Sequence, residues 1–172
     1  MKRFFRLLTL GSAALLLLPS ISIADPLSEA DWSGTYFGGN LDFHRGVPDG
    51  SGLISVHAGI DRAMGNTVLG GEVEVSDADA GAPGGTIDWM TRGKLRAGMS
   101  YGRTLVYATA GGVRAESSTG PEYGLLAGAG VEYRLIGRWT VGGEVLTHHF
   151  PNFDGAESYD VQTVSARVSF RF

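Results

Sequence analysis

The sequence of 172 residues contains no cysteine, so neither disulfide bonds nor a lipid-anchoring cysteine is available. After the first 24 residues there is also no apolar run of the length that a membrane-spanning helix needs, which is about 20 residues. Basic residues are few: 14 Lys and Arg face 18 Asp and Glu. Because nucleic-acid-binding proteins usually carry a basic surface, we expect no nucleic-acid partner.

The first 24 residues have the three parts of a secretory signal peptide. A basic start, MKRFFR, precedes an apolar run over residues 7–18, and the small residues Ser22 and Ala24 occupy the positions expected before a cleavage site. We therefore predict a signal peptide over residues 1–24 and a single domain over residues 25–172. An uncleaved N-terminal anchor is the alternative.

Alternation of apolar and polar residues recurs along the rest of the chain, and this period of two predicts β-strands. The 27 glycines argue against helices, in which each interior glycine costs about 1 kcal/mol. Each alternating segment has about ten residues, the length that crosses a bilayer as a tilted strand. The eight segments are 34–44, 53–61, 67–76, 88–99, 105–114, 122–134, 139–148 and 163–172.

The connections between these segments alternate in length. Short turns are expected at 62–66, 100–103 and 135–138, and longer loops at 45–51, 78–86, 115–121 and 149–158. Short turns at one end and longer loops at the other are typical of outer-membrane barrels. The predicted fold is all-β: an eight-stranded antiparallel up-and-down transmembrane β-barrel.

Charged residues lie in the middle of the predicted strands and face opposite charges on the neighbouring strand. An eight-stranded barrel has an interior that side chains just fill, and charges confined there must neutralise one another. We therefore predict that the polar faces point inward and form structural ion pairs, with Glu144 opposite Arg167. The predicted interior residues are Glu72, Glu74, Arg92, Lys94, Arg96, Glu132, Glu144 and Arg167.

The apolar faces then meet lipid, and their aromatic residues are predicted to gather at the two membrane interfaces. Near the short turns these are Phe37, Tyr107, Tyr133, Trp139 and Phe172. Near the longer loops they are Phe43, Trp89 and Tyr123.

Two segments resemble a known family. The chain ends on Phe172, preceded at two-residue steps by apolar residues, which resembles the C-terminal signature read by the outer-membrane assembly machinery. The segment WSGTYFGGNLDF (32–43) resembles the opening strand of the opacity-protein/porin-like family of small barrels in Gram-negative bacteria. The resemblance implies insertion in the outer membrane and contact with its lipid and lipopolysaccharide. We expect a monomer. The segment THHFPNFDG departs from the family pattern.

The sequence offers little evidence for a metal site or a catalytic site. His44, His148 and His149 are expected near the longer loops, but nothing in their spacing fixes a metal geometry. Lipid A deacylases of this architecture carry a His-x-Ser motif, whereas here Phe150 and Pro151 follow the two histidines at that spacing, so the nucleophile is missing. We predict no enzymatic activity, no cofactor and no metal.

The sequence thus predicts an outer-membrane protein with a structural, envelope or surface role and no wide pore. Three alternatives remain open. The first is a narrow porin-like channel, the second a soluble periplasmic, lipocalin-like binder with apolar residues inside, and the third a lipid A-modifying enzyme, which the missing serine disfavours.

Overall fold

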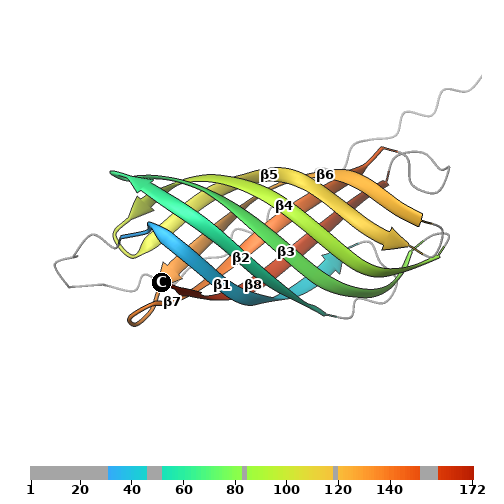
Figure 1. The fold of residues 1–172 in the computed structure, drawn as a ribbon, viewed down its shortest axis with the longest axis horizontal. Coiled ribbons are helices and arrows are strands. Elements are labelled where there is room, and N and C mark those ends of the chain that lie inside the picture. The colour runs from blue at the N-terminus through green and yellow to red at the C-terminus, as the bar shows by residue number, and fades with distance from the viewer. Residues whose placement is uncertain (1–30, 46–51, 83–84, 118–119, 152–158) are drawn as a thin grey trace, which may run out of the picture.

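The computed structural model describes residues 31–45, 52–82, 85–117, 120–151 and 159–172. The predicted signal peptide lies outside the described residues. Eight antiparallel strands, each paired with its neighbours in sequence order, close into a barrel whose strands are steeply tilted (Figure 1). The strands are β1 (Gly34–Arg45), β2 (Leu53–Met64), β3 (Thr67–Ala82), β4 (Gly85–Tyr101), β5 (Thr104–Ser117), β6 (Gly120–Arg134), β7 (Trp139–Phe150) and β8 (Tyr159–Arg171).

Closure joins the first and last strands. β1 pairs with β8 from Tyr36↔Arg171 to Arg45↔Gln162, so every strand has two partners and no ladder is left open. The predicted fold class is confirmed. Among the described residues, no helix is long and apolar enough to cross a membrane.

Two of the expected long loops are instead strand. β3 and β4 run on to the pair Ala82↔Gly85, and β5 and β6 run on to the pair Ser117↔Gly120, so two residues separate the strands in each hairpin. The expectation of loops at 78–86 and 115–121 is therefore wrong. A composition rich in glycine and polar residues does not exclude strands there, because backbone pairing in a hairpin does not depend on apolar side chains. Pro83-Gly84 is itself a turn signal.

Inward-facing glycines make room for large side chains in this narrow barrel. A Cβ on Gly59 would overlap the Tyr36 ring, and one on Gly130 would overlap the Tyr107 ring. Gly93, on the outer face, is not needed for packing in this way, because a Cβ there would contact no other atom. Glycine on one strand therefore accommodates a bulky residue leaning over from the next.

Candidate functional site

The distribution of polarity is the reverse of that in a soluble protein. Leu95 is 74% exposed on the outer wall, whereas its neighbours Lys94 and Arg96 are each 4% exposed inside. The same contrast holds around the barrel, where charged side chains are buried and large apolar ones are exposed. An apolar outer surface of this extent requires a non-aqueous environment. It also contradicts the soluble binder, which needs the opposite orientation.

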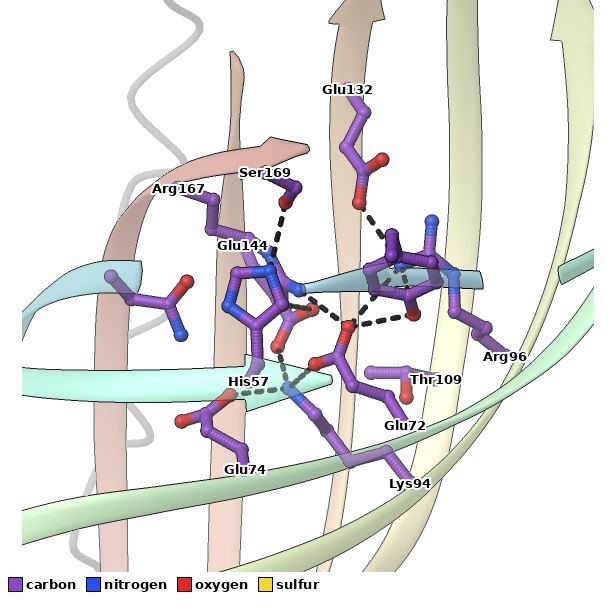
Figure 2. Close-up of polar contacts among 12 residues, drawn as sticks. His57, Glu72, Glu74, Lys94, Arg96, Thr109, Glu132, Glu144, Arg167 and Ser169 are labelled. Atoms are coloured by element: carbon purple, nitrogen blue, oxygen red, sulfur yellow. Dashed lines mark hydrogen bonds and ion pairs between the residues drawn. The ribbon is translucent and has the colours of Figure 1, made fainter. Parts of the chain in front are cut away.

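Inside the barrel, Lys94 lies among Glu72, Glu74 and Glu144 (Figure 2). Its ammonium nitrogen is 2.7 Å from Glu72 Oε1, 2.7 Å from Glu74 Oε2 and 2.8 Å from Glu144 Oε1. Its ammonium donates hydrogen bonds to Glu74 and Glu144, and its contact with Glu72 is an ion pair. These carboxylates come from β3 and β7, so Lys94 of β4 connects strands on opposite sides of the barrel.

Arginines extend this cluster along the barrel. Arg167 pairs with Glu72 and, at 2.7 Å, with Glu144. Arg96 Nη1 lies 3.0 Å from Glu132 Oε1, and its guanidinium carbon is 4.0 Å from the centre of the Tyr107 ring. The two arginines therefore join β3, β4, β6, β7 and β8, and both contact Glu72.

The network reaches both ends of the strands. Arg171 donates to Asp61 Oδ2 at 2.8 Å and to Glu132 Oε2 at 3.0 Å near the short turns. At the other end Arg92 pairs with Glu74 and lies 3.5 Å from Asp42. Two tyrosine hydroxyls donate into it, from Tyr36 to Glu72 at 2.8 Å and from Tyr107 to Glu144 at 2.7 Å, so all eight strands contribute to one connected set of contacts.

The charges nearly balance. Six buried carboxylates (Asp42, Asp61, Glu72, Glu74, Glu132 and Glu144) meet five buried cations (Arg92, Lys94, Arg96, Arg167 and Arg171). Burying an unpaired charge is expensive, but pairing with several hydrogen bonds offsets much of that cost. The oxygens of Glu72, Glu74 and Glu144 lie within 4.8 Å of one another, as a metal ion would require, yet the Lys94 ammonium already binds all three. Arrangement and charge therefore favour an ionic core over a metal site.

Comparison with protein families decides the identity. Residues 13–172 match the family model described as outer membrane protein beta-barrel domain. The chain belongs to this family. It is an outer-membrane β-barrel protein, so its exposed apolar wall faces lipid, and the short turns lie on the periplasmic side, as is usual in such barrels.

Solved structures share the fold of this outer-membrane barrel. Neisserial surface protein A (NspA) matches with a TM-score of 0.59 and 14% identity, covering 81% of this chain and 98% of that chain. OmpT of Vibrio cholerae matches with a TM-score of 0.34 and 15% identity, over 80% of this chain and 50% of that one, a likeness too weak to support an inference. No curated protein matched the sequence.

The outer-membrane barrel places all eight interior residues expected from the sequence inside, each at most 4% exposed. Glu144 and Arg167 form an ion pair, but diagonally: the residue opposite Glu144 is Ser165, and the one opposite Arg167 is Gly142. Sequence analysis did not select Asp61 and Arg171, although both sit on the polar faces of their strands. Both lie near strand ends, where the sequence pattern does not indicate which charged residue each one contacts.

The prediction that Tyr107 lies in an outer aromatic girdle is wrong. Tyr107 is 3% exposed and points inward, where its hydroxyl binds Glu144. β5 is almost apolar on both faces, so its alternation does not tell inside from outside. Tyr133 is half-buried near the end of β6. The other predicted girdle residues are at least half exposed on the outer wall: Phe37, Phe43, Trp89, Tyr123, Trp139 and Phe172.

A tryptophan fills the periplasmic end of the interior. Trp32 is fully buried against Val68 and Leu105, and the Arg171 guanidinium carbon lies 4.8 Å from the centre of its ring. Trp32 Nε1 donates to the Gly102 carbonyl at 3.3 Å. Before the start of β1, the Ser33 backbone N–H donates to the Asp31 carboxylate. This hydrogen bond holds the pKa of the Asp31 carboxyl below its ordinary value. The segment before β1 is therefore part of the barrel's closure.

The extracellular end of the outer-membrane barrel separates the three histidines. His148 is 1% exposed inside, and His44 Nδ1 lies 2.9 Å from Thr163 Oγ1. His149 instead points outward and pairs with Asp160 at 2.7 Å. The three imidazoles therefore do not converge on one metal position.

Proposed function

We propose that this outer-membrane barrel is a closed envelope protein with a structural or surface role and no open pore. The observation that carries the proposal is the Lys94 contact with three carboxylates across the interior. Lys94, Glu72, Glu74 and Glu144 are each at most 4% exposed, so they leave little space for water at this level. Side chains thus fill the cross-section at this level, as an eight-stranded barrel allows.

Electrical recording tests the proposal. Protein refolded in detergent, checked by heat-modifiable gel migration, is added to a planar bilayer. We expect no sustained unitary conductance, because the ion-paired interior leaves no continuous water path. A stable conductance from the refolded species, absent from the heat-denatured one, would contradict a closed barrel.

A narrow porin-like channel is the second candidate, and the polar lining of the interior favours it. Long Lys and Arg side chains can exchange partners, and each exchange would open a transient path. This candidate expects brief openings in the unmodified protein that Arg92→Ala lengthens, since Arg92 links Glu74 to Asp42 near the extracellular end. The closed barrel expects neither.

We infer no enzymatic role. His148 lies inside the barrel and His149 outside, so the two adjacent histidines cannot act on one substrate. Their sequence neighbours lack the serine that an acyl-transfer site of the His-x-Ser type needs. Release of fatty acid from lipid A by the refolded protein, lost in His149→Ala, would contradict this inference.

We also propose the partners of the barrel. The apolar outer wall with aromatic residues towards both ends fits outer-membrane lipid, with lipopolysaccharide at the extracellular side. The terminal strand ending at Phe172 fits recognition by the outer-membrane assembly machinery. A monomer is proposed because all eight strand edges are paired within one chain.

A further inference from the structure

We propose that the periplasmic rim of the barrel binds the anionic headgroups of phospholipids in the periplasmic leaflet of the outer membrane. The periplasmic rim consists of side chains on the three short turns and the strand ends beside them, at the left-hand end of the barrel in Figure 1. Its members are Arg62, Met64, Tyr101, Arg103, Ile136 and Arg138. The inference rests on the proposed contact between the outer wall and lipid, and it adds the headgroup that this end prefers.

Each short turn combines an arginine with an exposed apolar or aromatic side chain. The three segments are 62–66 (RAMGN), 100–103 (SYGR) and 135–138 (LIGR), and none of them contains Asp or Glu. The exposed fractions are 54% for Met64, 60% for Tyr101 and 83% for Ile136. This combination suits a membrane–water interface, where the apolar side chain contacts acyl chains and the cation contacts headgroups.

The positive charge of the periplasmic rim is not neutralised by the part of the chain that the structure describes. No carboxylate among those residues pairs with Arg62, Arg103 or Arg138. The two acids inside this end of the barrel, Asp61 and Glu132, are already paired with an interior arginine. The three rim arginines therefore have their charge available for an anion outside the barrel.

Arg62 lies on the lipid-facing wall itself. β2 alternates between its two faces, and Arg62 shares the outer face with Ile60 and Met64. By contrast Arg114, on the outer face of β5, is paired with Glu116. A cation on the lipid face of a barrel costs little only near an interface, where its long side chain reaches the headgroups. Arg62 therefore indicates that anionic headgroups lie at this level of the wall.

The opposite end of the barrel carries the opposite charge. Segments 77–88, 115–122 and 149–160 contain acidic residues but no Lys or Arg. This asymmetry directs an anionic partner to the periplasmic rim.

Exposed apolar side chains favour a lipid over other anionic partners. A polysaccharide or an acidic protein would satisfy the arginines, but a lipid also covers Ile136 and Tyr101 beside them. These side chains continue the apolar wall on which Trp139 and Phe172 are exposed, and this wall faces lipid in an outer-membrane barrel. Charge complementarity and continuity with the lipid-facing wall thus point to the same partner.

Trp139 is an intrinsic reporter for the periplasmic rim. It directly follows Arg138 and is 50% exposed on the outer wall. Trp89 is similarly exposed towards the other end of the barrel, whereas Trp32 is fully buried inside, out of contact with lipid. Fluorescence of the Trp89→Phe protein therefore reports on lipid at the periplasmic rim, and fluorescence of the Trp139→Phe protein reports on lipid at the opposite end.

Quenching by brominated lipids tests the proposal. The refolded proteins are reconstituted in phosphatidylcholine vesicles that contain an equal fraction of either dibromo-phosphatidylglycerol or dibromo-phosphatidylcholine. We expect the anionic lipid to be preferred at Trp139 by about fivefold, the preference that one Lys or Arg near an anionic surface supplies, and neither lipid to be preferred at Trp89. The preference at Trp139 should disappear in the Arg62→Gln/Arg103→Gln/Arg138→Gln triple variant and persist in Arg114→Gln.

The outcomes separate this inference from the lipid contact on which it rests. Quenching of Trp139 by neither lipid would contradict lipid contact of the wall itself. Equal quenching by both lipids, or a preference that survives in the triple variant, would leave that contact intact and overturn the rim inference. Arginine-dependent retention on purified peptidoglycan, together with equal quenching, would assign the rim to a cell-wall polymer instead. Heat-modifiable migration checks that each variant is folded, and Arg62→Gln alone replaces the triple variant if that one does not fold.

Discussion

At the scale of single residues, Lys94 has the largest number of charged partners at one atom. Lys94→Met keeps similar volume but leaves Glu72, Glu74 and Glu144 without their shared cation. Removing one partner of a buried ion pair costs about 3–5 kcal/mol, so we expect a loss of at least that size in the free energy of unfolding. Urea titration of the refolded barrel in lipid vesicles measures it.

An exposed pair is the control for Lys94. Arg114 and Glu116 lie 2.6 Å apart, and both side chains are about half exposed on the outer face of β5. Exposed ion pairs contribute at most about 1 kcal/mol, so Arg114→Gln is expected to change stability by less than that. If Lys94→Met and Arg114→Gln lower the free energy of unfolding by similar amounts, the buried Lys94 contacts contribute no more to stability than an exposed ion pair does.

The inward glycines give a second prediction at this scale. Gly130→Ala places a methyl group against the Tyr107 ring and so disturbs the hydrogen bond from Tyr107 to Glu144. Overpacking of this kind costs about 1–3 kcal/mol. Gly93→Ala on the outer face meets nothing and is expected to be neutral. Thermal unfolding of both variants under identical conditions checks this, and equal destabilisation would count against the packing argument.

Single residues also show which interior positions could be predicted from the sequence alone. Mid-strand charges such as Glu72 and Arg92 could be placed inside because their strands alternate strictly and because each faces an opposite charge on the next strand. Tyr107 could not, since β5 carries few polar residues on either face. Asp61 and Arg171 meet only after the barrel closes, and that long-range contact has no local signal.

At the scale of elements, alternation located the strands well, but their lengths depend on pairing. β3 and β4 continue past the expected boundary, with a register irregularity between Asp77 and Ala80. A bulge of this type breaks the period of two that sequence analysis relies on. The structure also explains the glycine at the start of β1, which the sequence pattern does not. Gly34 adopts a φ of 124°, and a Cβ there would overlap the Phe172 carbonyl oxygen.

The terminal strand makes a prediction that separates assembly from stability. Phe172 is 60% exposed and stacks on Phe37 at 5.7 Å between ring centres. If the assembly machinery reads this residue, Phe172→Ala lowers the folded fraction in the outer membrane severalfold while refolding in detergent proceeds as before. Phe43→Ala, which removes an exposed outer aromatic ring at the opposite end of β1, is the control. A defect that appears equally in detergent would assign Phe172 to stability alone.

At the scale of the whole molecule, the barrel is closed twice. The Lys94 cluster fills the middle, and Trp32 fills the periplasmic end together with Val68 and Leu105. The two closures are chemically different: charged side chains make the first, and apolar side chains make the second. If the barrel is closed as we propose, either cluster on its own interrupts a water path, and the barrel opens only when both are removed.

This arrangement predicts a non-additive effect on conductance. Trp32→Ala and Lys94→Ala are each expected to leave a planar bilayer as insulating as the unmodified protein does, because the other closure remains. The double variant, once shown to be folded by heat-modifiable migration, is expected to conduct. Conductance in Lys94→Ala alone would mean that Trp32 does not seal the periplasmic end. A silent double variant would mean that further side chains, with the apolar cluster around Leu146 and Phe150 as the next candidate, close the extracellular half on their own.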